Sequence, residues 1–153
     1  MPNGWLNVPH FRQEFNYSCV AACVRMVMAY YGHNESEDNV RQLLGTKPRG
    51  TRAANVTNIV QLGFDVRFGA SNLSQLQATL AANVPPIIFL LTGTLDYWET
   101  NDAHAVVLIG IDAATIHLND PFFDTFSQQT PLANFQQAWA TTGHLAAFIR
   151  PQS

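Results

Sequence analysis

The sequence predicts a single α+β domain over residues 1–153, with helices in the first half and an antiparallel sheet in the second. Apolar residues recur at helical spacing after Cys19, and short apolar strand patterns dominate from residue 87 onward. Helical patterns precede strand patterns instead of alternating with them, which favours α+β over a parallel α/β sheet. The 153 residues, 47% of them hydrophobic, are enough for one sizeable core.

The first half contains three predicted helices. The first covers 19–31, where apolar residues repeat every three or four positions until Gly32 stops the pattern. Two more are expected over 35–44 and 51–62, because each segment is followed directly by a glycine. A short alternating strand is predicted over 64–68.

The second half is expected to begin with a helix over 73–82 and to continue mainly as strands. The apolar run IIFLL is one strand, and 103–111 is apolar on both faces, which is typical of a central strand covered on each side. Residues 114–118 are its predicted hairpin partner. A short helix near 132–139 and a closing strand, LAAFI, complete the fold.

Composition argues against several classes of partner. Charged residues make up 12% of the chain and the formal net charge is -3, so no basic patch points to nucleic acid or to an anionic membrane surface. The N-terminal stretch MPNGWLNVPHF lacks the features of a signal peptide, and no segment could span a bilayer. We therefore expect a cytoplasmic protein without membrane insertion, with delivery elsewhere left open. Two cysteines are too few for a disulfide framework.

Four residues combine into a candidate catalytic centre. Cys19 begins the first helix, and the positive end of a helix favours a thiolate. His104, at the start of the central strand, can exchange a proton with that sulfur. Asp120 follows the hairpin partner, so paired strands can bring it close enough to orient the ring. The side-chain amide of Gln13 can donate to an oxyanion at the attacked carbon.

Each of these residues also has a plainer explanation. A helical cysteine is usually a small buried hydrophobe, as we expect of Cys23, and His104 could be a satisfied core histidine. Asp120 before proline could be an ordinary turn residue, and Gln13 a solvated amide. A zinc site from Cys19, Cys23 and His104 is disfavoured by the ligand spacing, and we expect no metal and no other cofactor. The remaining histidines are expected at the surface: His10, His33, His117 and His144.

The order of the four residues resembles the papain-like cysteine peptidases, and specifically the bacteriocin-processing, double-glycine leader peptidase family. Three stretches carry the similarity, QEFNYSCVAACVRM, HAVVLIGI and NDPFFD, and it extends from about Val8 onward. The resemblance implies a papain-like fold, with the cysteine on the N-terminal helical half and the histidine and aspartate on an antiparallel sheet. It implies Cys19 as nucleophile, His104 as general base and acid, Asp120 as orienter and Gln13 as oxyanion donor.

Two positions depart from the family pattern, in which an aspartate precedes the nucleophile and a glycine follows it. Ser18 and Val20 occupy these positions here. Because both adjoin the sulfur, we expect them to contact substrate. The side chain of Val20 is expected to narrow the cleft where a glycine-containing substrate would pass.

The resemblance implies a stand-alone cysteine peptidase that cleaves peptide bonds, leader peptides among its candidate substrates, through a thioester intermediate. The expected partner is a peptide or protein substrate, and a secretion or transporter partner is left open. Two alternatives are kept. One is a catalytically inactive peptide-binding module of the same fold. The other is a delivered effector or toxin with protease, deamidase or acyl-transferase activity.

Overall fold

A computed structural model describes residues 5–153 of the chain. Its helices are α1 (Cys19–Tyr30), α2 (Glu37–Leu44), the 3-10 helix η1 (Ala53–Leu62), α3 (Leu73–Ala81), the 3-10 turn η2 (Thr92–Thr94) and α4 (Leu132–Ala140). Its strands are β1 (Phe64–Ala70), β2 (Ile87–Leu91), β3 (Ala103–Asp112), β4 (Thr115–Asn119), β5 (Gln128–Pro131) and β6 (Leu145–Pro151).

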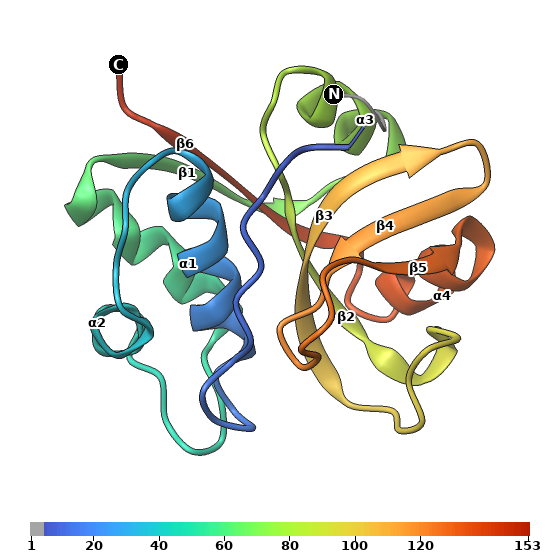
Figure 1. Cartoon of the computed structure of the whole chain (residues 1–153), viewed down its shortest axis with the longest axis horizontal. Coiled ribbons are helices and arrows are strands. Elements are labelled where there is room, and N and C mark those ends of the chain that lie inside the picture. Colours follow the sequence, from blue (N-terminus) through green and yellow to red (C-terminus); the bar gives the residue numbers. More distant parts are fainter. Residues whose placement is uncertain (1–4) are drawn as a thin grey trace.

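The strands form one antiparallel sheet in the order β1-β6-β2-β3-β4-β5. β3 and β4 form the predicted hairpin, with a register shift between Leu108 and Gly110. In Figure 1, α1 and α2 lie to one side of the twisted sheet, and α4 lies beside β5 on the other. Because every pair of neighbouring strands in this sheet is antiparallel, the α+β class is confirmed.

Both faces of the sheet are covered with apolar side chains. Odd-numbered residues of β2 and β3, such as Phe89 and Val107, belong to a core shared with α1, α2 and η1. Even-numbered residues, such as Leu90 and Val106, belong to a second core shared with α3 and α4, in which Trp139 is fully buried. This arrangement confirms the prediction of a central strand covered on each side, and it packs α1 against β3.

α1 begins at Cys19 and ends at Tyr30, close to the predicted bounds. Most of its side chains are buried, so tertiary packing stabilises it more than helix propensity does. The side chain of Ser18, at the N-cap, makes no hydrogen bond to the helix. The N–H groups of the first turn therefore keep their capacity to stabilise negative charge beside Cys19.

The segment after α2 forms a 3-10 helix where the sequence predicts an α-helix over 51–62. β-branched and asparagine residues in this segment have low α-helical propensity. The side chains of Asn55 and Asn58 donate to the carbonyl oxygens of Leu44 and Leu43, at 2.9 and 3.0 Å. η1 thereby satisfies carbonyl groups at the end of α2, and the two helices are joined side by side.

Two features of the second half differ from expectation. The sequence does not predict β5, because QQTP has no apolar alternation, yet this strand pairs with β4 at the sheet edge. His117, expected at the surface, is only 3% exposed. Its ring lies 3.9 Å from the ring of Trp5, because the N-terminal segment crosses the hairpin and the Leu6 N–H donates to the Ile109 carbonyl at 2.8 Å.

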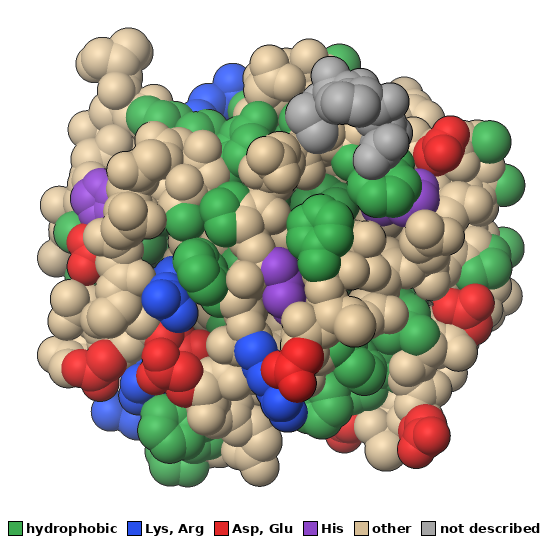
Figure 2. All heavy atoms as spheres, in the orientation of Figure 1, with side chains coloured by type: hydrophobic (Ala, Val, Ile, Leu, Met, Phe, Trp, Pro, Cys, Tyr) green, Lys and Arg blue, Asp and Glu red, His purple; other side chains and the backbone are tan. Residues whose placement is uncertain are grey.

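Within residues 5–153, no helix is long and apolar enough to cross a membrane. Residues 1–4, part of the stretch considered for a signal peptide, lie outside the described residues. Acidic and basic side chains lie next to one another over the lower part of the face in Figure 2. That mixture fits the small net charge of the sequence.

Candidate active site

The N-terminal end of α1 and the start of β3 line one cleft. Cys19 is the first residue of α1 and His104 the second residue of β3, and both border a hollow of about 430 Å³. A second hollow of about 260 Å³ is bordered by the same two residues. The two hollows thus adjoin at Cys19 and His104, and together they are called the groove below.

The two parts of the groove differ in chemistry. The larger one is lined by the aromatic side chains of Tyr17, Trp98 and Phe122 and by charged residues of both signs, Arg49 and Asp102. The smaller one is mainly apolar, with Val20, Phe89, Leu90 and Leu145 among its lining residues. A chain lying in the groove would therefore meet different side-chain environments on the two sides of Cys19.

His104 is held by Asp120. Nε2 of the ring lies 2.6 Å from Oδ1 of the carboxylate, and because a carboxylate only accepts, Nε2 carries the proton. The other ring nitrogen, Nδ1, is left for Cys19, which borders the same two hollows as the ring and contributes to raising its pKa. Asp120 follows β4 directly and is completely buried. Three of the four predicted residues thus lie together at one site.

Four donors surround the Asp120 carboxylate. Besides His104, the backbone N–H of Phe122 donates to Oδ1 at 3.0 Å. Tyr97 O–H and Trp98 Nε1–H donate to Oδ2 at 2.9 and 2.8 Å. Burial raises the pKa of Asp120, but the hydrogen bond and charge of His104, followed by the bonds from Trp98 and Phe122, bring it below its usual value. Asp120 therefore stays an anion.

Sequence reasoning did not find Tyr97 and Trp98. They lie in the irregular segment between η2 and β3, where neither helical nor strand periodicity singles out a residue. The available signal is chemical: two adjacent aromatic residues that each carry a hydrogen-bond donor. Trp98 also packs edge-on against His104, with ring centroids 4.8 Å apart, so it contacts both members of the pair.

The ring of His104 is an imidazolium at neutral pH. Burial lowers its pKa, but the hydrogen bonds with Asp120 and Cys19 and the charges of these two groups outweigh burial and raise the pKa to about 9. The ring therefore has a proton to give at the cleft that Cys19 borders. The arrangement can therefore provide a nucleophile and a proton donor at the same time.

The two cysteines differ in accessibility. Cys19 is partly exposed and borders the cleft. Cys23, one turn further along α1, is fully buried, and burial, followed by the charges of Cys19 and Asp120, raises the pKa of its thiol well above the usual value. The explanation as a small buried hydrophobe therefore fits Cys23. Over the described part of the chain, no group of three or more His, Cys, Asp or Glu side chains could hold a metal ion.

Gln13 reaches the same cleft from the loop before α1. It is 8% exposed, which does not fit a solvated amide. Its Nε2 donates to the Phe15 carbonyl at 2.7 Å, and a primary amide has a second N–H. Its backbone N–H donates to the Pro121 carbonyl at 2.7 Å. Gln13 is therefore fixed beside the segment that carries Asp120.

The two neighbours of Cys19 differ in their access to the cleft. Val20 borders the apolar hollow, as a substrate contact requires. Ser18 is completely buried, and its hydroxyl accepts from the Phe15 N–H and donates to the Phe15 carbonyl, both at 3.0 Å. The expected substrate contact of Ser18 finds no support in this arrangement, because its hydroxyl is occupied within the loop.

Comparison with protein families gives a match along most of the chain. The model of the Peptidase C39-like family matches residues 5–147. No curated protein matches the chain.

Three solved structures share the fold over nearly their whole length. The double glycine motif protease from the AMS/PCAT transporter, solved in complex with the leader peptide, has a TM-score of 0.77 at 23% identity, covering 97% of this chain and 95% of its own. The peptidase domain of Streptococcus ComA has a TM-score of 0.76 at 24% sequence identity, and the match covers 95% of this chain and 100% of that domain. A C39-like peptidase from Bacillus anthracis has a TM-score of 0.78 at 18% sequence identity, and the match covers 96% of each chain. At these identities the likeness shows the papain-like fold.

The first prediction from this site concerns the two thiols. Iodoacetamide should modify Cys19 at least about tenfold faster than Cys23, because only Cys19 is accessible and lies beside a protonated imidazole. Peptide mapping after timed exposure of the folded protein gives the two rates. Faster labelling of Cys23, or equal and slow labelling of both, would contradict the description of this site.

The second prediction concerns the titration of His104. NMR should give a midpoint near pH 9 for this ring. In Asp120→Ala the midpoint should fall by roughly two units or more, because burial then acts against the charged form with less compensation. Since the folded-state pKa lies above the unfolded value of about 6.5, stabilisation by this pair is complete below pH 6.5 and is lost as the pH rises through about 9. An unchanged midpoint in the variant would exclude Asp120 as the cause.

Proposed function

The chain belongs to the Peptidase C39-like family, and on this premise we propose that it is a cysteine peptidase that hydrolyses peptide bonds through Cys19. The observation that carries the proposal is that Cys19 and His104 border the same groove, with the His104 ring held by the buried Asp120 carboxylate. His104 and Asp120 have the protonation states that acyl transfer requires, a protonated ring and an ionised carboxylate.

In the proposed reaction, the Cys19 thiolate attacks the carbonyl carbon of the substrate, and the carbonyl oxygen becomes an oxyanion. His104 then gives its proton to the leaving nitrogen, the carbon–nitrogen bond breaks, and a thioester remains on the sulfur. The neutral ring next takes a proton from a water molecule that attacks the thioester. The carbon–sulfur bond breaks, the acid product leaves, and the thiolate–imidazolium pair is restored.

The oxyanion would lie between two donors. One is the second N–H of the Gln13 amide, and the other is the backbone N–H of Cys19, since the first N–H groups of a helix have no partner within it. Donors fixed in place before the reaction stabilise developing charge without reorganising, and removing one such donor typically costs about 10²–10³ in kcat. Asp120 keeps the ring in the tautomer that leaves Nδ1 facing the sulfur.

The proposed substrate is a peptide in extended form, with leader peptides as the first candidates. The groove on both sides of Cys19 supports a chain substrate over a small molecule, and one structure of the same fold was solved with a leader peptide. Val20 borders the apolar side of the groove. Its branched side chain would disfavour a substrate backbone that lies close to the wall, as a glycine pair would. Peptides with bulkier residues at that position therefore need testing as well.

The direct test of this function is an intact-mass time course with two peptide sets, one with Gly-Gly junctions and one with bulkier residues at the same position. The wild-type protein should release a new carboxyl terminus by adding one water. Cys19→Ala should be inactive, and His104→Ala should lose roughly a hundredfold or more in turnover. Cleavage by Cys19→Ala at the wild-type rate would exclude the mechanism. Release of ammonia without cleavage would instead assign deamidation.

A sharper prediction follows from the four donors around Asp120. Asp120→Asn should lower kcat by roughly a thousandfold or more. If the new amide oxygen faces His104, the amide NH₂ meets Trp98 Nε1–H, which cannot accept. If the amide is turned round, the NH₂ faces His104 and forces the ring into the wrong tautomer.

Trp98→Phe removes the donor that causes this conflict. The hydroxyl of Tyr97 can then turn and accept from the amide introduced at position 120, while His104 keeps its correct tautomer. The loss of kcat caused by Asp120→Asn should therefore be at least about tenfold smaller in the Trp98→Phe background than in the wild type. A double-mutant cycle on kcat measures this difference. Equal losses in both backgrounds would mean that Trp98 does not determine the need for a carboxylate.

A further inference from the structure

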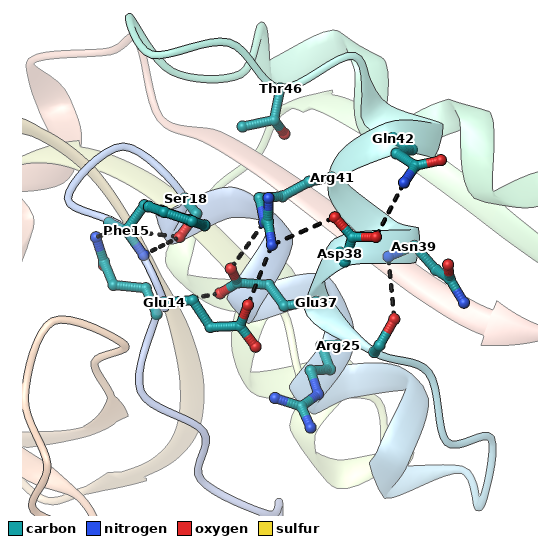
Figure 3. A network of polar contacts seen from close by, with 12 residues as sticks. Glu14, Phe15, Ser18, Arg25, Glu37, Asp38, Asn39, Arg41, Gln42 and Thr46 are labelled. Atoms are coloured by element: carbon teal, nitrogen blue, oxygen red, sulfur yellow. Dashed lines mark hydrogen bonds and ion pairs between the residues drawn. The ribbon is translucent and has the colours of Figure 1, made fainter.

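A buried carboxylate joins α2 to the loop before the nucleophile. Glu37 is the first residue of α2 and is only 1% exposed. Its Oε1 accepts from the backbone N–H of Glu14 at 3.0 Å, and its Oε2 accepts from Nε of Arg41 at 3.0 Å. Figure 3 shows both carboxylate oxygens engaged, one toward the loop and one toward Arg41. None of the chemistry described above uses this group.

Two consecutive N–H groups of the loop are bound to opposite halves of the molecule. The N–H of Gln13 donates to the Pro121 carbonyl, directly after Asp120, at 2.7 Å. The N–H of Glu14 donates to Glu37, on the helical half. Because adjacent peptide units share their torsion angles, fixing both N–H groups fixes the backbone from which the Gln13 side chain extends.

The same loop also holds the Gln13 amide directly. The Phe15 carbonyl accepts from Gln13 Nε2 at 2.7 Å, from the Ser18 N–H at 3.2 Å and from the Ser18 hydroxyl at 3.0 Å. The position of this carbonyl therefore determines where the amide lies relative to Cys19. The bond from Glu14 N–H to Glu37 anchors the backbone next to this carbonyl to α2.

We propose that Glu37 is a positioning residue for the oxyanion donor, holding the loop so that the Gln13 amide faces the carbon attacked by Cys19. This proposal rests on the function proposed above. The Glu37 carboxylate reaches the site through the loop backbone, by way of the Glu14 N–H, and its other oxygen is held by Arg41. Its effect should therefore appear in the chemical step and depend on the presence of Gln13.

The competing explanation is that Glu37 only stabilises the fold through its ion pair with Arg41. That pair is real: Arg41 also contacts Glu14 at 3.1 Å and Asp38 at 3.6 Å, and it stacks on the Phe15 ring with 4.6 Å to the centroid. Glu37→Gln separates the two explanations. The amide oxygen of Gln can still accept from Glu14 N–H, whereas its NH₂ then faces Arg41 Nε, another donor, so both the charge pair and the hydrogen bond with Arg41 are lost.

The experiment combines three variants with two readouts. Glu37→Leu removes the acceptor, Glu37→Gln keeps it, and Asp38→Asn is the matched control, an exposed carboxylate on the same helical turn. kcat and KM are measured on a cleaved peptide, at a temperature where thermal melting shows each variant folded. Amide hydrogen exchange of residues 13–18 is measured on the same samples, and this readout does not depend on activity.

Glu37→Leu should lower kcat by about tenfold or more with little change in KM, and its loop should lose exchange protection. Glu37→Gln and Asp38→Asn should stay within about threefold of wild type and keep the protection. In the Gln13→Ala background, Glu37→Leu should have no further effect on kcat, because the group it positions is absent. A multiplicative loss in the double variant, or equal losses in Glu37→Gln and Glu37→Leu, would overturn the proposal.

Failure of the underlying function can be distinguished from failure of this inference. If wild-type protein cleaves no peptide, the peptidase proposal fails, while hydrogen exchange still decides whether Glu37 fixes the loop. Unchanged protection of residues 13–18 in a folded Glu37→Leu variant would overturn the anchoring role whatever the activity. Iodoacetamide labelling of Cys19 should be the same in all variants, which verifies that the nucleophile itself is intact.

Discussion

The bond between His104 and Asp120 sets the requirements that the surrounding structure meets. It joins the start of one strand to the residue after its hairpin partner, and its carboxylate is removed from water. A buried carboxylate is costly unless donors surround it. The segment before β3 supplies two side-chain donors and the turn after β4 supplies a backbone N–H, so two irregular segments have defined conformations. This anion, together with Cys19, in turn raises the pKa of the buried ring to about 9.

The second requirement is that the helical half of the molecule, which carries Cys19, is placed correctly relative to His104 and Asp120. Packing of α1 on β3 gives the approximate position, because the odd-numbered strand residues and the buried face of α1 share one core. Hydrogen bonds of the loop before α1 give the finer position, with contacts to both halves. Apolar packing thus brings the two parts together, while a few directional bonds fix atoms at the scale that chemistry needs.

Much of this arrangement could be predicted from the sequence, and the reasons are physical. Strong apolar periodicity located α1, β2, β3 and α4, and glycines located the ends of α2 and η1, because these signals are local. The candidate residues Cys19, His104 and Asp120 were predicted from their chemistry and from their order along the chain. β5, the burial of His117 and the donors Tyr97 and Trp98 could not be predicted, since each depends on a tertiary neighbour: β4, the Trp5 segment and the Asp120 carboxylate. Glu37 was hidden for the same reason, as an acidic residue in the first turn of a helix is usually solvated.

The position of β6 in the sheet affects how the chain folds during its synthesis. This strand, residues 145–151, lies between β1 and β2, so the edge strand that follows η1 reaches the rest of the sheet only through it. During synthesis, residues 5–140 can form helices and the β2–β3–β4–β5 portion, yet β1 has no partner until β6 has left the ribosome. Domains mature as units once their long-range partners are present. In a nascent or truncated chain that lacks this strand, α1 could still pack on β3, but β1 would have no connection to the sheet. The sheet that supports the site would therefore be complete only once the last strand has been made.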